Sequence, residues 1–406
     1  MPERADRYPE VDALRALAAI AVLGTHAAIF AGADYPGSDI GRYAQRLEVG
    51  LTIFFVISGF LLYRPFVAAR MREREGPRTA AYAWRRLLRI APAYWVALTL
   101  SALLVSKDEV FSSDAPYFFL LGQTYSTETL PGGLTQAWTL CVEIAFYAFL
   151  PVWAWAMDRL VRRSLRAEVI ALATLVLLSL GYKLLILSGT DPRQVVITPL
   201  LIALPAYLDQ FALGMGLAVL TVHLQQRDRA APAAVRVIDR WPALPWLVAI
   251  AAFWVVATRI GIGDALFEPF TPAQYLGRHY LYALIGVAVV VPAVVGTPGR
   301  GLVRRVLANR TAAWLGLVSY GIYLWHFTTL TLLERAGFGG DEPLHPYIAW
   351  PLAGLATAVV AAAASWYLIE RPALSLKRLV PGARSRVAPL PAAPEPQPAA
   401  RIADPS

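Results

Sequence analysis

The amino-acid sequence predicts an all-α membrane protein that crosses the bilayer about ten times. Of its 406 residues, 57% are hydrophobic and only 16% are charged, whereas about 25% of the residues in an average soluble domain are charged. Apolar runs of about 20 residues, the length that crosses a bilayer core, recur along the chain. Short links rich in arginine separate many of these runs. Together the composition, the runs and the links favour a polytopic helical bundle.

Each expected span is an apolar run bounded by charged residues or by proline and glycine. The ten runs are residues 12–31, 48–68, 87–106, 137–157, 167–188, 199–222, 244–260, 279–296, 313–333 and 347–369. The apolar piece 116–122 is too short to cross and is interpreted as an interfacial or re-entrant segment. We find no internal repeat of the kind that many transporters have.

The links between these spans alternate in charge. Arginines crowd the segments 70–89, 158–166, 223–241 and 297–312. The other links are mixed or acidic, with Asp34, Asp39, Asp108, Glu109, Asp114, Glu128, Asp264, Glu268, Asp341 and Glu342. Because arginine-rich links stay on the cytoplasmic side of a membrane, we expect both termini to be cytoplasmic and the protein to lie in the cytoplasmic membrane.

We expect one membrane domain over residues 1–372. Residues 373–406 begin with basic side chains, among them Lys377 and Arg378, and continue into a stretch rich in proline and alanine. Such a composition cannot build a packed core. This segment is predicted to be a disordered cytoplasmic tail.

Charge and cysteine content argue against several kinds of function. A net charge of +9 would suit a nucleic-acid partner, but the basic residues lie between apolar spans, which indicates membrane topology instead. Cys141 is the single cysteine, so neither an internal disulfide nor a cysteine metal cluster can form. The histidines do not form a HExxH or similar set. We expect no nucleic acid, no metal and no permanently bound cofactor.

The first expected span carries two ionisable residues inside an apolar run. Arg15 and His26 are eleven positions apart, which brings a helix round to within roughly 20° and places both side chains on one stripe, about 16 Å apart. Asp12 flanks the lower end of this stripe. Ionisable groups inside a membrane indicate function, although a histidine can also simply join helices. A neutral imidazole can deprotonate a hydroxyl or accept an acyl group, and Arg15 can hold a phosphate or orient a carboxylate.

A pair of arginines opens the third span. Arg86 and Arg89 are three positions apart and therefore share one helix face. Two guanidinium groups at a membrane surface suit a polyphosphate such as a nucleotide or coenzyme A. The alternative is that they contact lipid head groups and only fix the topology.

Polar side chains also occur in three other spans. The small pair Ser58-Gly59 indicates close helix packing. Glu143 lies about one turn inside the fourth span, where it could orient a histidine or pair with an arginine. Glu370 and Arg371 are interpreted as an ion pair at the end of the last span.

The stretch 316–326 combines small residues, hydroxyls and a histidine. Ser319, Tyr323 and His326 lie in it, and His326 is deep in the expected span. The remaining histidines fall at span ends or in links and are interpreted as incidental: His223, His279 and His345.

Six motifs run through the chain from residue 12 to residue 372. They are Asp12-Ala-Leu-Arg15 with His26, Phe54-Phe55-Val-Ile-Ser58-Gly59-Phe60, Arg86-x-x-Arg89-x-x-Pro92, Trp138-Thr-Leu-x-x-Glu143-x-x-Phe146-Tyr147, Gly316-x-x-Ser319-Tyr320-Gly-x-Tyr323-Leu-x-His326 and Glu370-Arg371-Pro372. Each is weak alone, but the full set in this order resembles acyltransferase family 3, the integral-membrane O-acyltransferases.

The resemblance implies transfer of an acyl group, commonly acetyl from acetyl-coenzyme A, to a hydroxyl of a saccharide, a glycolipid or a macrolide-type antibiotic. It implies a catalytic role for His26 with Arg15, and handling of the donor near Arg86 and Arg89. Two positions depart from the family pattern. Many members have Asp where this chain has Thr52, so a charge is missing here. Many have Ser where this chain has Thr139, so the hydroxyl is kept.

We therefore predict an O-acyltransferase that uses acetyl-coenzyme A or another acyl-coenzyme A as its donor substrate. His26, Arg15 and Glu143 are the expected catalytic residues, and the phosphates of the donor are expected on Arg86 and Arg89. Further residues that we expect to bind substrate or support the site are Asp12, Ser58, Ser319, Tyr323 and His326. A transporter of a glycolipid or small amphipathic molecule is the competing class, because polar residues inside a helical bundle serve both functions.

Overall fold

A computed structural model of the protein describes residues 8–32, 39–105, 107–130, 132–161, 164–191, 193, 195, 197–226, 231–261, 270–297, 299–339 and 344–380. Some sequence-based expectations fall outside these residues. They are the tail beyond Val380 and the link charges Asp34, Arg162, Arg163, Arg227, Arg229, Asp264, Glu268, Asp341 and Glu342.

Helices form nearly all of the described chain. The long ones are α1 (Pro9–Phe30), α3 (Gly50–Met71), α4 (Thr79–Val105), α6 (Trp138–Leu160), α7 (Leu165–Ser188), α8 (Leu204–Gln225), α10 (Leu244–Thr258), α11 (Pro272–Val294), α13 (Arg310–Arg335) and α14 (Pro346–Ser365). The short ones are α2 (Asp39–Gln45), α5 (Ala115–Phe119), α9 (Ala233–Arg240), α12 (Leu302–Leu307) and α15 (Arg371–Ser375), with the turns η2 (Arg46–Val49), η3 (Asp108–Phe111), η4 (Gln123–Tyr125), η5 (Thr135–Ala137), η6 (Pro199–Ile202), η7 (Trp366–Glu370) and η8 (Leu376–Leu379). The described residues contain no sheet, only one isolated bridge, so the prediction of an all-α polytopic membrane protein is confirmed.

The number of apolar helices is slightly lower than the ten expected spans. Eight helices of the described chain are long and apolar enough to cross a membrane, and a ninth is added if α9 and α10, which meet at 85°, form one broken span. The helix α10 alone has only 15 residues. The helix α13 has 26 residues but is not among the eight, because it carries polar side chains that face the interior of the bundle.

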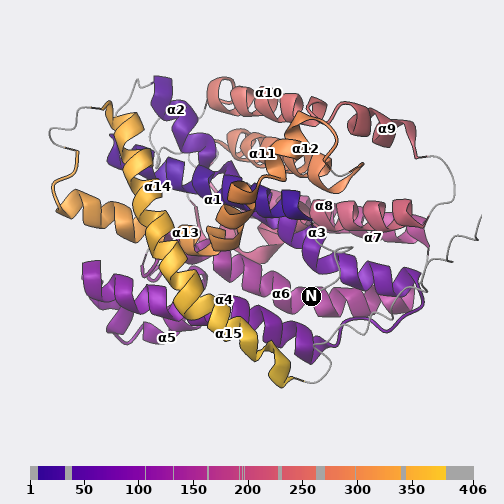
Figure 1. The fold of residues 1–406 in the computed structure, drawn as a ribbon, viewed down its shortest axis with the longest axis horizontal. Coiled ribbons are helices and arrows are strands. Elements are labelled where there is room, and N and C mark those ends of the chain that lie inside the picture. The colour runs from indigo at the N-terminus through magenta and orange to yellow at the C-terminus, as the bar shows by residue number, and fades with distance from the viewer. Residues whose placement is uncertain are drawn as a thin grey trace, which may run out of the picture.

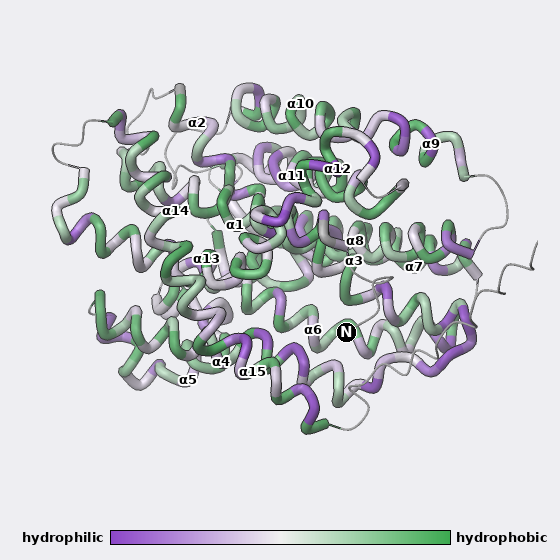
Figure 2. The backbone as a smooth tube through the Cα atoms, in the orientation of Figure 1, coloured by the Kyte–Doolittle hydropathy of each residue, from purple (hydrophilic) through white to green (hydrophobic). Residues whose placement is uncertain are grey.

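The long helices run roughly side by side, and α1 lies inside the bundle (Figure 1). Its neighbours are α3, α13 and α14, while α3 packs on α8 and α7 packs on α8. The C-terminal ends of α3, α6 and α8 lie together at one end of the molecule, on the right of Figure 1. Hydrophilic residues gather at the same end (Figure 2), as the charge alternation in the sequence predicts.

The small residues of α3 allow this helix to approach α8 closely. A Cβ atom added at Gly59 would lie 2.2 Å from the carbonyl oxygen of Phe211, and one added at Gly214 would lie 2.0 Å from the carbonyl oxygen of Val56. Such distances are impossible for a real side chain, so both glycines are required by the backbone contact. The packing role predicted for Ser58-Gly59 is confirmed for the glycine.

Two boundaries differ in detail from the expectations. The apolar piece 116–122 contains only the short helix α5, as expected of a segment that does not cross. At the other end, the last long helix continues through η7, α15 and η8 as far as Leu379, past the expected domain end at residue 372. This continuation packs against α4.

Candidate active site

Two histidines from helices far apart in the sequence meet inside the bundle. His26 of α1 and His326 of α13 lie with Nδ1 of the former 3.1 Å from Nε2 of the latter, and their ring centroids are 4.9 Å apart. His326 is fully buried, whereas His26 is half-buried. His326, which was expected only as a supporting residue, thus contacts the predicted catalytic histidine directly.

The hydrogen bonds around this pair fix which nitrogen carries the proton. Nδ1 of His326 lies 2.7 Å from the carbonyl oxygen of Tyr323, so it must donate, and Nε2 of a neutral His326 is then an acceptor. Nδ1 of His26 faces that acceptor and the carbonyl oxygen of Val22 at 3.0 Å, so it must also carry a hydrogen. The lone pair of a neutral His26 is therefore on Nε2, which makes no hydrogen bond within the described part of the chain.

The close contact of α1 with α13 brings the two histidines together. A Cβ atom added at Gly316 would lie 1.9 Å from the carbonyl oxygen of Asp12, so only glycine allows this approach near the start of both helices. His26 and His326 meet at the other end of the same contact. Ser319, between these points, is buried and donates to the carbonyl oxygen of Gly316 at 2.8 Å, which is a packing role.

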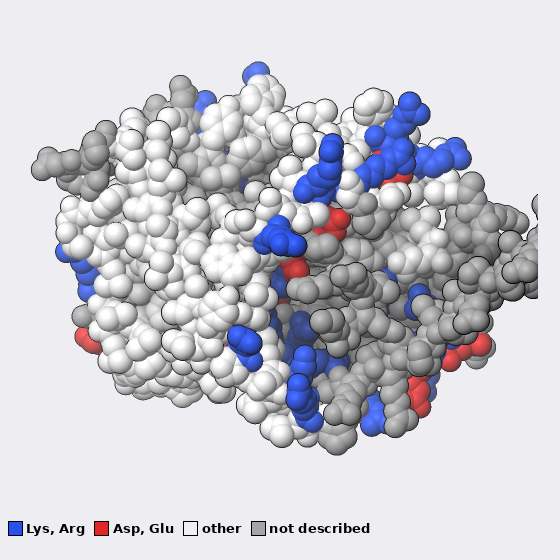
Figure 3. Space-filling model, in the orientation of Figure 1, with Lys and Arg blue, Asp and Glu red and all other residues white. Residues whose placement is uncertain are grey.

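A cavity of about 430 Å³ lies beside the histidines, toward the end of the bundle with the basic links. Its lining includes the predicted residues Arg15, Ser58, Arg86, Arg89, Glu143 and Tyr323. Arg15 forms no hydrogen bond or ion pair with the rest of the described chain, so its guanidinium group is available to a ligand. Basic side chains gather over α4 and α15 in the lower middle of Figure 3, whereas the left part of that face is almost free of charge.

The two arginines of the predicted donor site have different surroundings. Arg89 forms an ion pair with Glu370 at 3.0 Å and lies 5.5 and 5.6 Å from the rings of Tyr320 and Trp366. The expected ion pair of Glu370 with Arg371 is therefore wrong, because the carboxylate turns inward to Arg89 and Arg371 is exposed. Arg86 forms no ion pair with another described residue, so more of its charge is available to a bound phosphate.

Glu143 lies in this cavity and not beside a histidine. Its carboxylate accepts hydrogen bonds from Ser58 at 2.9 Å and from Tyr147 at 2.6 Å. Two hydroxyl donors stabilise a carboxylate that is surrounded by arginines. Of the two alternatives expected for Glu143, orienting a histidine or pairing with an arginine, the geometry favours the second kind of surroundings, because the carboxylate shares the cavity with the arginines.

Tyr323 separates the cavity from the histidine pair. Its hydroxyl donates to the carbonyl oxygen of Gln136 and is 2.5 Å from the hydroxyl of Thr139, and its ring centroid is 5.9 Å from that of His326. The hydroxyl at position 139, one of the two departures from the family pattern, therefore anchors this tyrosine. Thr52, the other departure, is buried and does not line the cavity.

A basic side chain lies on the opposite side of the pair. The ring of Phe327 is 5.4 Å from that of His26, and Nζ of Lys107 lies 5.9 Å from the centre of the Phe327 ring. Lys107 follows the end of α4 and donates to the carbonyl oxygen of Gly133. Burial lowers the pKa of Lys107, and the nearby Glu109 partly offsets this.

Five polar residues of the cavity wall were not among the predicted site residues: Arg85, Thr139, Tyr147, Tyr320 and Lys377. Arg85 and Tyr147 line it from α4 and α6, and Lys377 lines it from η8. Arg85 adjoins the predicted arginine pair, and Tyr147 belongs to the motif that begins at Trp138, so the sequence offered a reason to consider both. It offered none for Lys377, which follows the segment expected to end the domain.

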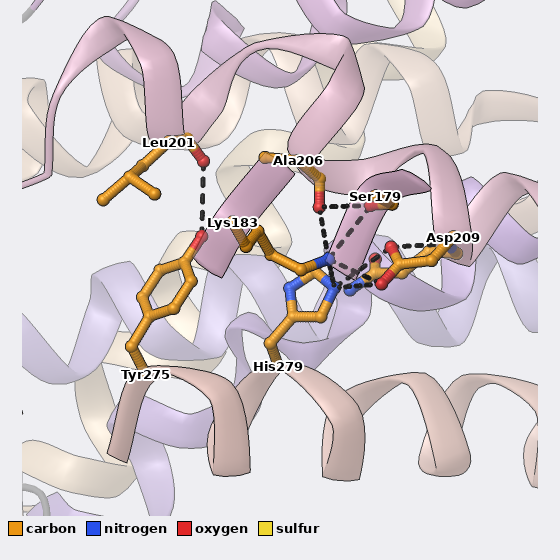
Figure 4. A network of polar contacts seen from close by, with 8 residues as sticks. Ser179, Lys183, Leu201, Ala206, Asp209, Tyr275 and His279 are labelled. Carbon is orange, nitrogen blue, oxygen red and sulfur yellow. Dashed lines mark hydrogen bonds and ion pairs between the residues drawn. The ribbon is translucent and has the colours of Figure 1, made fainter. Parts of the chain in front are cut away.

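A second buried cluster was also missed (Figure 4). Nζ of Lys183 lies 2.6 Å from Asp209, and Nε2 of His279 lies 2.9 Å from the same carboxylate. All three side chains are buried, in α7, α8 and α11. The interpretation of His279 as incidental is therefore wrong: its place near the start of α11 faces the interior. The described residues contain no group of three or more His, Cys, Asp or Glu side chains placed to hold a metal ion.

Known proteins with similar sequences are O-acetyltransferases by name. The chain is 24% identical to the peptidoglycan O-acetyltransferase of Listeria monocytogenes over 91% of its own length and 57% of that relative. It is 26% identical to a putative peptidoglycan O-acetyltransferase of Bacillus subtilis, over 90% of its length and 55% of the relative. A putative O-acetyltransferase of Staphylococcus aureus is 22% identical, over 90% of the length of this chain and 57% of the length of the relative. The chain thus spans little more than half the length of these relatives.

No solved structure matches the chain. The model of one protein family, described as an acyltransferase domain, matches residues 8–370. This match includes the motifs that carried the resemblance. Only the last motif, Glu370-Arg371-Pro372, extends two residues beyond it. The chain therefore belongs to this family of acyltransferases, and the resemblance to acyltransferase family 3 is confirmed.

Proposed function

We propose that the protein transfers an acyl group, acetyl in the first instance, from acyl-coenzyme A to a hydroxyl of a saccharide in the cytoplasmic membrane. The observation that carries this proposal is the contact of His26 with His326 next to a cationic cavity, which in a neutral His26 assigns the lone pair to Nε2. A base and an anion-binding cavity are the two parts that such a transfer needs.

In the proposed reaction His26 acts as a general base. Its Nε2 takes the proton of the acceptor hydroxyl, and the oxygen attacks the carbonyl carbon of the thioester. The carbon–sulfur bond then breaks, and the thiolate leaves with the proton from His26, so that atoms and charge balance. The Nδ1 hydrogen of His26 stays on its acceptors, His326 and the carbonyl oxygen of Val22, which keep the ring oriented.

The donor enters the cavity from the end of the bundle that carries the basic links. Arginines and lysine on the wall attract the phosphates of coenzyme A, and Arg86 and Arg15 offer charges not paired with a described carboxylate. The volume of about 430 Å³ is in the range of small-molecule sites. Tyr323 both lines the cavity and contacts His326, so the thioester is proposed to lie beside this side chain.

The acceptor is proposed to be a saccharide of the cell envelope. The names of the Listeria and Bacillus relatives refer to peptidoglycan, whose sugars offer the hydroxyl that the reaction requires. His26 is four residues from the far end of α1, so the acceptor approaches from the opposite side to the donor.

The test uses purified protein in nanodiscs with radiolabelled acetyl-coenzyme A and soluble peptidoglycan fragments. Wild-type protein should label the saccharide, and His26→Ala should reduce the rate by at least about a hundredfold, the usual contribution of a general base. His223→Ala, a histidine at the end of α8 away from the cavity, is the matched control and should retain the full rate.

Equal rates for His26→Ala and wild type would contradict the assignment of His26. Absence of any acetyl-coenzyme A consumption by folded wild-type protein, with flux of a glycolipid across the nanodisc or vesicle membrane, would favour the competing class, a transporter.

A further inference from the structure

The segment that follows the last long helix forms part of the donor cavity. Leu374 of α15 and Lys377 of η8 line it together with Arg85 and Arg86 of α4. Composition alone had placed Lys377 in a disordered tail, and the family match ends at residue 370. We propose that Lys377 binds a phosphate of coenzyme A and that residues 371–379 are the outer wall of the donor site, an inference that rests on the proposed function.

Two polar contacts hold this segment against α4. Just before it, Glu370 forms the ion pair with Arg89 at 3.0 Å. Within it, the carbonyl oxygen of Leu376 accepts a hydrogen bond from Nε1 of Trp84 at 3.1 Å. These contacts on both sides of α15 fix its position relative to the arginines of α4. Lys377 therefore lines the cavity from a folded segment.

The charges of the cavity leave an excess that suits a polyanion. The basic side chains on its wall are Arg15, Arg85, Arg86, Arg89 and Lys377, and the acidic one is Glu143. Arg89 is paired with Glu370. The excess therefore comes from Arg15, Arg86 and Lys377 against Glu143. Lys377 is exposed at the mouth and forms no ion pair within the described chain. The flexible side chain of a lysine placed there can keep its ammonium group in contact with a phosphate while the ligand enters.

The position of Lys377 also indicates which end of the donor it meets. The inner end of the cavity is closed by Tyr323, next to the histidines, so the thioester belongs there. The mouth of the cavity then meets the other end of coenzyme A, which carries the adenosine 3′-phosphate and the diphosphate. The basic side chains at this mouth are Arg85, Arg86 and Lys377. Charge-assisted hydrogen bonds to phosphate are the strong kind.

The experiment measures binding of coenzyme A to the full-length protein in detergent by calorimetry. Lys377→Gln should weaken binding about tenfold, the effect expected when one hydrogen bond to a charged group is lost, and Lys377→Arg should restore most of it. Arg378→Gln is the matched control: this neighbouring side chain is exposed and does not line the cavity, so its change should be less than twofold. Pantetheine, which lacks the phosphates, should bind wild type and Lys377→Gln equally.

The outcomes separate the inference from the proposed function. If wild type does not bind coenzyme A, both the donor of the proposed function and the role of Lys377 are overturned. If wild type binds and Lys377→Gln binds equally well, or if Arg378→Gln is weakened as much, only the role of Lys377 is overturned. An equal loss of pantetheine binding would show a collapsed wall and would likewise reject a phosphate contact.

Discussion

At the scale of the residue, the site differs from a triad in which a carboxylate orients the catalytic histidine. The Nδ1 hydrogen of His26 is shared between two neutral acceptors, the imidazole of His326 and the carbonyl oxygen of Val22. A carboxylate there would stabilise a protonated His26 strongly, whereas a neutral partner does so weakly. The arrangement therefore orients the His26 ring without supplying a negative charge.

The role of His326 as a positioning residue leads to a prediction. His326→Leu removes one of the two acceptors of the Nδ1 hydrogen and the ring that packs on His26, and should lower kcat about tenfold or more with KM for acetyl-coenzyme A unchanged, since His326 does not line the donor cavity. His326→Gln retains an acceptor oxygen and should recover a substantial part of kcat. Steady-state kinetics in nanodiscs measure both. A fall in both variants that appears in KM and not in kcat would contradict this role.

The sequence predicted the members of the site better than their contacts. Arg15 and His26 could be placed on one stripe because both lie on one helix with known periodicity. The contact of His26 with His326 joins residues 300 positions apart, and no spacing rule within a helix reveals which helices are neighbours. The same limit explains why the sequence left the partner of Glu143 open between a histidine and an arginine, and did not indicate its hydrogen bonds with Ser58 and Tyr147.

At the scale of the element, the buried Lys183, Asp209 and His279 connect α7, α8 and α11 (Figure 4). Lys183 also donates to Ser179 at 3.0 Å and to the carbonyl oxygen of Ala206 at 2.9 Å, which uses its three hydrogens. The cluster is therefore internally satisfied, and a function in fixing the packing of these helices suffices to explain it.

A double-mutant cycle tests this structural role. Asp209→Asn leaves the ammonium of Lys183 buried without a counter-charge and should lower the free energy of unfolding by about 3–5 kcal/mol. Lys183→Met leaves the carboxylate of Asp209 buried without its ammonium partner and should have an effect of the same size. The double variant Lys183→Met/Asp209→Asn removes both charges and should be much closer to wild type than the sum of the single effects predicts. Thermal unfolding in detergent measures all three. Strict additivity of the single effects would contradict the coupling.

The contact of α1 with α13 is a second element that can be tested. Gly316→Ala forces the two backbones apart, because its Cβ would lie 1.9 Å from the carbonyl oxygen of Asp12, and should destabilise the protein by about 1–3 kcal/mol. Gly181→Ala in α7 is the control, since nothing lies within 4 Å of its added Cβ. Since the same contact carries His26 and His326, activity in a folded Gly316→Ala sample should fall, whereas Gly181→Ala should retain both stability and rate.

At the scale of the whole molecule, composition and periodicity were sufficient for the fold class and for the approximate limits of nearly every long helix. They were less accurate at the ends. α13 is polar enough to fall outside the set of clearly apolar helices because it contributes to the site, and α15 with η8 follows the bundle although its composition resembles a tail. In both places tertiary contacts, here with α1 and with α4, decide what local sequence cannot.

The orientation of the bundle in the membrane stays a prediction, and the sequence offers a direct way to test it. Cys141 is the single cysteine and is buried, so cysteines placed at the helix ends should be the reactive ones. Ser164 lies in a basic link and Thr190 follows the opposite end of α7. Because basic links stay in the cytoplasm, a membrane-impermeant maleimide added to intact cells should label Thr190→Cys and not Ser164→Cys, whereas both should react after the cells are permeabilised. Labelling of Ser164→Cys in intact cells would reverse the orientation and would place the mouth of the donor cavity, with Arg86 and Lys377, on the side of the membrane where no acyl-coenzyme A is made.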